Sequence, residues 1–383
     1  MVHKIAFFPV GNGDMTLIKL ISGLTILIDI NIRTAADNSG SPIPDVAALL
    51  RRYLKCDGLG RPSVDIFVLT HPDADHCRGL MRHFHLGSPD TYAKADNKIL
   101  IQEIWSSAII FRRASRILTL GDDAQAFATE ARRRVKLFRD QGVAGEGDRI
   151  QLMSEDENGK TDDLQAILVK VGETVPKFNG NLESGLTARL LGPLPKAATE
   201  QEEEALAKNH SSIIFQFEFQ VNGMTTGRCL VAGDAEVAVW ERLWKNYGHT
   251  GWLKYDILLA PHHCSWHSLS YDSLSALGNA VQVSPKARKA LSEACSGAII
   301  IASSNPIKAE TADPPADRAK HEYLEILKPV SGQFKCTGEY PTEQNPDQLI
   351  IEIGQAGPRL TSNLVLPGGA NSILVGRQPL GHG

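Results

Sequence analysis

The chain has 383 residues, of which 42% are hydrophobic and 22% charged, so it holds enough apolar material for a large α/β domain. Its formal net charge of −4 excludes a strongly basic protein that binds a polyanion over its whole surface. No apolar stretch approaches the ~20 residues of a membrane span, and residues 1–10 have no signal-peptide layout, so we expect a cytoplasmic protein with no membrane contact.

The N-terminal part of the chain predicts short strands and one helix. Gly11-Asn-Gly-Asp14 is a turn signal between two apolar runs. The strand expected over 64–70 leads directly into His71. Ligand-type side chains at the carboxyl end of a strand are typical of the sites of α/β proteins. Strands are expected over 5–10, 15–20, 24–30 and 64–70, and a helix over 44–54.

Residues 81–205 are less regular, and we interpret this region as partly an insertion. The segment 112–141 contains a helix rich in alanine and arginine, which could follow a phosphate backbone or could be an ordinary solvated helix face. Residues 154–161 and 199–208 are acidic or polar and are expected to form loops or a short exposed helix.

Strands and helices alternate again in the rest of the chain, and residues 335–383 are expected to be a C-terminal extension. This order predicts an α/β fold, an αββα sandwich of two mixed sheets, as a single domain over 1–383. Strands are expected over 212–219, 229–232, 255–260, 298–302 and 349–353, and helices over 237–244 and around 323–327.

The six cysteines have no paired CxxC spacing. In a cytosolic chain of this size they are expected to be free thiols. Cys77 and Cys264 lie inside candidate site motifs, where we expect them to be small packing residues.

The run His71-Pro-Asp73-Ala-Asp75-His76 places two histidines and two aspartates in six residues after an apolar strand. Each of the four is a metal-ligand type, and none suits a buried turn without a partner. Further donors follow or precede predicted strands at His210, Asp234 and the pair His262-His263. Together these side chains predict a metal centre at the strand ends.

His71-Pro-Asp73-Ala-Asp75-His76 resembles the His-x-His-x-Asp-His signature of the metallo-β-lactamase superfamily, with Asp73 in place of the second histidine. That aspartate is a feature of the branch similar to the hydrolase domain of ComEC-type competence proteins. Val10-Gly-Asn-Gly-Asp14 resembles the opening motif of that branch, and Pro261-His-His-Cys-Ser265 resembles its Pro-His-His-Gly-Ser. The resemblance covers about 1–30, 62–80 and 205–330.

The resemblance implies two metal ions and a role for each ligand. It implies that one ion is held by His71, Asp73 and His210, that the other is held by Asp75, His76 and His262, and that Asp234 bridges both. Asp75 and His263 are the expected catalytic residues, and Asp14 and Asp29 are expected to orient the ligands. The sequence does not distinguish His262 from His263 as the ligand, and it leaves open whether His210 and His321 belong to the site.

Two divalent ions, zinc or manganese, would activate water without a serine or cysteine nucleophile. The expected function is a phosphodiesterase or nuclease, with nucleic acid or another phosphodiester as the partner. A hydrolase of an ester, lactone, thioester or peptide bond is the alternative, because a fold does not fix a substrate. A non-catalytic binding protein is the third possibility, and the insertion could bind a partner protein.

Overall fold

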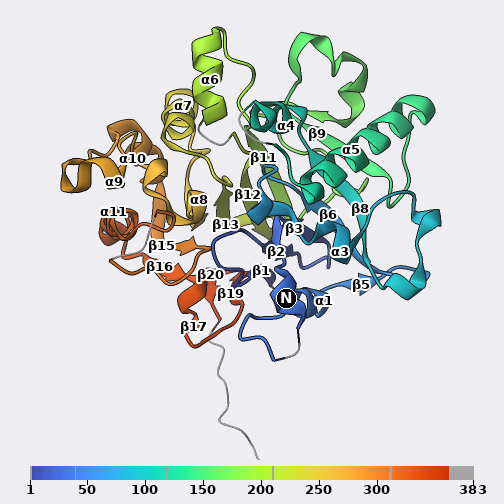
Figure 1. The fold of residues 1–383 in the computed structure, drawn as a ribbon, viewed down its shortest axis with the longest axis horizontal. Helices are drawn as coiled ribbons and strands as arrows, with labels where there is room; N and C mark the ends of the chain where they lie inside the picture. Colours follow the sequence, from blue (N-terminus) through green and yellow to red (C-terminus); the bar gives the residue numbers. More distant parts are fainter. Residues whose placement is uncertain (1, 39, 117–118, 209–210, 310–312, 362–383) are drawn as a thin grey trace, which may run out of the picture.

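The computed structural model describes residues 2–38, 40–116, 119–208, 211–309 and 313–361. Its centre is a pair of β-sheets (Figure 1). The first sheet is mixed, because its β3, β6, β8, β9 and β10 run parallel while β2, β1, β19 and β20 pair antiparallel. In spatial order its strands are β10 (Leu168–Val169), β9 (Arg149–Met153), β8 (Ile99–Ser106), β6 (Pro62–Val68), β3 (Thr25–Ile28), β2 (Thr16–Lys19), β1 (His3–Phe7), β19 (Leu349–Gly354) and β20 (Gly357–Leu360), with β5 (Lys55–Cys56) on β6 and β7 (Phe84–His85) on β8.

The second sheet is also mixed. Its first three strands are antiparallel, and parallel pairing continues from β13 to β16. In spatial order its strands are β11 (Leu186–Gly192), β12 (Ile214–Val221), β13 (Met224–Val231), β14 (Tyr255–Leu259), β15 (Ala294–Ala302) and β16 (Gln333–Cys336). The short β4 (Ile30–Asn31) continues from β3, and β17 (Pro341–Thr342) pairs with β18 (Asn345–Pro346).

Helices cover the outer faces of both sheets (Figure 1). The arginine-rich segment contains the second half of α4 and all of α5, and the acidic segment 199–208 contains α6. The helices are α1 (Val46–Arg51), α2 (Ala74–Cys77), α3 (Leu80–His83), α4 (Ala108–Ser115), α5 (Asp122–Gln141), α6 (Glu200–Lys208), α7 (Val237–Tyr247), the short turn α8 (Pro261–Cys264), α9 (Leu274–Leu277), α10 (Pro285–Leu291) and α11 (Asp317–Leu327).

Alternation along the strands separates two hydrophobic cores. In β14, Ile257 belongs to the core between the sheets, whereas the next residue, Leu258, belongs to the core beneath α7, α10 and α11. Successive side chains of a strand point to opposite faces, so one strand can serve both cores. Aromatic rings of the two sheets meet in the inner core, where the centroids of Trp105 and Phe215 are 5.2 Å apart.

The predicted α/β fold, an αββα sandwich of two mixed sheets, is therefore confirmed. The expected extension, 335–383, includes β19, which pairs with β1 over five residues and is buried on alternate positions. The domain boundaries given above stay a prediction. No helix in the described part of the chain has the length and apolarity that a membrane-spanning segment needs.

Candidate metal centre

The parallel strands of both sheets end on the same side of the sandwich, and the predicted ligands follow them. Asp29 follows β3, and His71 follows β6 after two further residues. From the second sheet, Asp234 follows β13, and the adjacent His262 and His263 follow β14. Two β-sheets that each present the carboxyl ends of parallel strands therefore enclose one polar centre between them.

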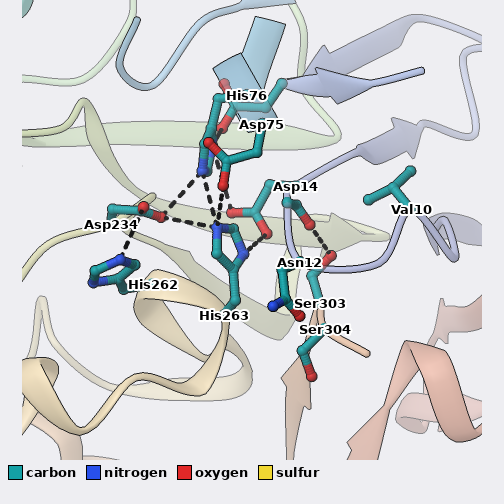
Figure 2. Close-up of polar contacts among 12 residues, drawn as sticks. Val10, Asn12, Asp14, Asp75, His76, Asp234, His262, His263, Ser303 and Ser304 are labelled. Atoms are coloured by element: carbon teal, nitrogen blue, oxygen red, sulfur yellow. Dashed lines mark hydrogen bonds and ion pairs between the residues drawn. The ribbon is translucent and has the colours of Figure 1, made fainter. Parts of the chain in front are cut away.

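The first group of ligand atoms meets at one oxygen of Asp234 (Figure 2). His76 Nε2 lies 3.1 Å from Asp234 Oδ1, and His263 Nε2 lies 3.5 Å from the same oxygen. The two ring nitrogens are 3.2 Å apart, and Asp75 Oδ2 lies 3.3 Å from His263 Nε2. Four donor atoms thus surround one point.

The second group meets at the other oxygen of Asp234. His71 Nε2 lies 3.4 Å and His262 Nε2 3.6 Å from Asp234 Oδ2. Asp73 Oδ2 lies 3.9 Å from His71 Nε2, which makes this group somewhat wider than the first. The Asp234 carboxylate therefore faces one set of two imidazoles with each of its oxygens.

These spacings fit metal coordination. Two atoms that each bind one tetrahedral ion at about 2.1 Å lie about 3.4 Å apart. Asp234 Oδ1 is buried and forms no hydrogen bond of good geometry, and a buried polar atom of this kind calls for a partner. Asp14, His76, Asp234 and His263 form a buried cluster of ligand atoms within 4.8 Å of one another, and this cluster could hold a metal ion.

Charge leads to the same conclusion. Six carboxylates face four imidazoles, so ionised carboxylates leave an excess of two negative charges even when every imidazole is protonated. A divalent cation would neutralise that excess. The carboxylates are those of Asp14, Asp29, Asp73, Asp75, Asp234 and Glu236, and the imidazoles are those of His71, His76, His262 and His263.

The pKa directions reflect the same excess of negative charge. Burial lowers the pKa of His76, but the charges of Asp234 and Asp29 outweigh it, and the pKa is well above the usual value. At His263, burial is likewise outweighed, by Asp234 and Asp14, and the pKa rises to about 10. The ring protons thus supply positive charge that a metal ion would otherwise supply.

A left-handed turn aims the two adjacent histidines at opposite sides of Asp234. His262, His263 and Cys264 have φ of 53°, 53° and 70°, although none is glycine. Such residues are strained by about 1–2 kcal/mol each and are found where surrounding contacts enforce them. Here His262 N donates to Gly233 O at 3.0 Å, and Ala316 N donates to Cys264 O at 3.0 Å.

Asp29 supports histidines of both groups. Its buried carboxylate pairs with His76 Nδ1 at 2.8 Å and accepts hydrogen bonds from Thr70 N at 2.7 Å and Thr70 Oγ1 at 2.5 Å. Because the Thr70 hydroxyl donates to Asp29, it can only accept from His71 Nδ1, which lies 3.1 Å away. Nδ1 of each ring is therefore a hydrogen-bond donor, and Nε2 of each ring faces the centre.

The other two histidines face carboxylates of their own. Asp14 Oδ1 lies 3.3 Å from His263 Nδ1, and Glu236 Oε1 lies 3.5 Å from His262 Nδ1. The turn that precedes Asp14 is tightly packed, since a β-carbon on Gly13 would lie 2.2 Å from Asn31 Nδ2. This packing fixes the backbone at Asp14. Ser303 Oγ donates to Gly13 O at 2.7 Å and ties the same turn to the end of β15 (Figure 2).

The structure places some of the predicted residues differently from what the sequence analysis expected. His263, expected to be catalytic, joins the group of Asp75 and His76, while His262, expected in that group, joins His71 and Asp73. His321 is not in the centre: it lies on α11 with 70% of its side chain exposed and pairs with Asp317 at 3.2 Å. His210 lies outside the described residues.

The sequence analysis did not identify two residues that support the centre, Glu236 and Ser303. Glu236 stands two residues after Asp234, and this short spacing was the available signal for a role beside His262. Ser303 follows β15, and no motif in the sequence indicated its contact with Gly13. The thiols of Cys77 and Cys264 are directed at backbone carbonyls, of Asp73 and Ala316, which agrees with the packing role expected for both.

The arginine-rich segment is largely occupied by internal ion pairs. Arg113 is buried and binds both oxygens of Glu203 at 2.8 and 2.9 Å, together with Ser211 Oγ at 2.7 Å. Arg134 is buried against Glu130 at 2.7 Å. The other paired arginines of the segment are Arg112, Arg116, Arg133 and Arg139. This pairing favours the interpretation of the segment as an ordinary part of the fold rather than a track for a phosphate backbone.

Comparison with known proteins finds similarity among solved structures alone. No family model and no curated protein sequence matches this chain. Among solved structures that match is a long-form RNase Z from yeast, at 8% identity and a TM-score of 0.32, over 68% of this chain and 32% of that chain. This chain thus spans about a third of the length of that protein, and similarity of this degree says nothing of its substrate, metal or catalytic residues.

Proposed function

We propose that this chain is a metal-dependent hydrolase with two divalent ions, and that its substrate is a phosphodiester. The observation that carries the proposal is the pair of ligand groups on the two oxygens of Asp234, each with the spacing of a coordination sphere. Centres with two metals on a shared carboxylate are typical of phosphatases and nucleases, and also of some peptidases.

Each group offers two imidazole nitrogens and two carboxylate oxygens, a donor set that suits zinc or manganese. His76, His263, Asp75 and Asp234 would hold one ion, and His71, His262, Asp73 and Asp234 the other. Bound divalent ions would lower the pKa of a water molecule into the neutral range and polarise the attacked bond.

The protein residues have distinct tasks in this scheme. Asp29 and Thr70 hold the rings of His76 and His71 with Nε2 toward the centre. Asp75 is the most exposed carboxylate of the centre, with 33% of its side chain accessible. Among these carboxylates it would therefore be the one best placed to accept a hydrogen bond from the attacking water. His263 is almost completely buried, which favours a ligand over a group that contacts substrate.

Elemental analysis combined with turnover tests the proposal. Protein supplied with manganese should contain about two ions per chain and hydrolyse bis-p-nitrophenyl phosphate. Asp234→Asn should lose metal and at least 100-fold in turnover, whereas Asp140→Asn, which removes an exposed carboxylate of a helix pair, should lose neither.

Other results would favour the alternatives. Two ions with hydrolysis of p-nitrophenyl acetate but not of the phosphodiester would favour an ester or related carboxylic substrate. Failure to bind zinc or manganese at all would contradict the hydrolase proposal and favour a binding protein with this fold.

A further inference from the structure

Two arginines near the metal centre differ from those of the arginine-rich segment. Arg33 follows β4, and Arg78 follows α2, the helix that contains His76. Their backbones are adjacent, since Ile32 N donates to Arg78 O at 2.9 Å and Asn31 pairs with Arg78 in a parallel bridge. Within the described chain neither guanidinium forms an ion pair with a carboxylate.

Arg33 lines a cavity of about 220 Å³. Its guanidinium lies over Gly11, because a β-carbon on that glycine would lie 3.4 Å from Arg33 Nη1 and 3.1 Å from Asn305 Oδ1. Glu343 also lines the cavity, but its carboxylate is 3.0 Å from Lys308 Nζ and is neutralised there. The cavity therefore keeps an uncompensated guanidinium beside a side-chain amide.

The positive charge of Arg78 also acts on the guanidinium of Arg33. Partial burial lowers the pKa of Arg33, and the positive charge of Arg78 lowers it further. No carboxylate lies between these two positive charges, so a bound anion would offset the repulsion between them. A planar guanidinium donates two parallel hydrogen bonds to phosphate, so the anion that this arrangement fits best is a phosphate group.

The cavity is next to the metal centre along the chain. Gly11 forms part of its wall, and Asp14, three residues later, faces His263 (Figure 2). Three residues of chain span at most ~11 Å. One substrate could therefore place one phosphate at the metal centre and a neighbouring phosphate in the cavity.

We propose that this cavity binds a second, non-scissile phosphate of the substrate through Arg33, with Arg78 beside it and the Asn305 amide as a further hydrogen-bonding group. This proposal rests on the phosphodiesterase function proposed above and narrows its substrate class to molecules with at least two phosphate groups. Nucleotides with a phosphate on each side of the sugar, and short oligonucleotides, belong to that class.

Two thymidine substrates test the proposal: thymidine 5′-(p-nitrophenyl phosphate) with and without a 3′-phosphate. In the manganese-loaded protein the 3′-phosphate should lower KM about tenfold or more. Arg33→Gln should bring the two KM values to within about twofold, and Arg33→Lys should recover only part of the difference. Arg132→Gln removes an exposed arginine of α5 and should keep the full tenfold difference.

Calorimetric titration of metal-free protein with thymidine 3′,5′-bisphosphate separates this proposal from the proposed function. Binding that is lost in Arg33→Gln, without turnover of either ester, would support the phosphate cavity and contradict the phosphodiesterase. Turnover with equal KM for both esters in the wild type would overturn the cavity and leave the phosphodiesterase standing. An unchanged KM ratio in Arg33→Gln would also overturn it.

Discussion

Asparagine at position 29 would keep the shape of the buried aspartate and reverse one of its hydrogen-bonding groups. The amide oxygen can still accept from Thr70 N, but an NH₂ group would then face Thr70 Oγ1 and His76 Nδ1, both of which are donors in the wild type. His76 would be free to move its proton to Nε2, the nitrogen that faces Asp234. We therefore expect Asp29→Asn to weaken metal binding while the chain still folds.

Loss of a carboxylate that orients a metal-bound histidine typically lowers metal affinity about 10- to 100-fold. That range equals about 1.4–2.7 kcal/mol, and the upper half is expected here because Asp29 orients His71 as well, through Thr70. The free energy of unfolding of the metal-free protein should change less, because the substitution also removes a negative charge from a centre with an excess of negative charge.

The chain offers a matched control. Asp65 accepts hydrogen bonds from Thr25 N at 2.8 Å and Thr25 Oγ1 at 2.7 Å, the same aspartate–threonine pairing across β3 and β6 at the opposite end of these strands. Competition with a zinc-binding dye should give weaker binding for Asp29→Asn and wild-type binding for Asp65→Asn. Equal affinities for wild type and Asp29→Asn, or an equal loss in both variants, would refute the reasoning.

Three further predictions follow from the geometry. His262→Ala and His263→Ala should each lose about one of the two ions in elemental analysis; full metal content in either would remove that histidine from the ligand set. Gly13→Ala should lower the free energy of unfolding in urea by about 2–4 kcal/mol, because its β-carbon would lie 2.2 Å from a side-chain nitrogen, while Gly145→Ala, with no atom within 4 Å of the added carbon, should not. The pKa of Glu203 is lowered to about 2, because hydrogen bonds from a buried arginine and a backbone N–H outweigh burial. Its contribution to stability is thus present above the ordinary value of 4.5 and lost as pH falls through about 2. Glu203→Gln should cost about 3–5 kcal/mol at pH 7 and flatten that acid-induced loss; a wild-type acid transition would contradict this assignment.

The sequence predicted the position of the centre well because both signals it uses are local. Apolar alternation locates the strands, and the polar residues that follow each strand end must meet where parallel strands end together. The run that begins at His71 and the isolated Asp234 were found in this way. The orienting role expected for Asp29 came instead from the resemblance to the metallo-β-lactamase superfamily.

The sequence could not distinguish the tasks of His262 and His263, because these depend on backbone angles. Three consecutive non-glycine residues with positive φ contradict the local preference of each residue, and only contacts with distant segments hold them in place. Long-range pairing also determines whether the arginines of the arginine-rich segment are available to a ligand. Arg113 meets Glu203 across 90 positions, a separation at which charge patterns in a sequence indicate nothing about partners.

The left-handed turn at His262–Cys264 also constrains the order of events during folding. Its backbone partners are Gly233, at the end of β13, and Ala316, just before α11. A turn that is unfavourable by itself forms only after these segments have docked, so a partly folded chain has scattered histidines but no arranged centre. Coordination of an ion by both ligand groups would then follow assembly of the second sheet rather than initiate it.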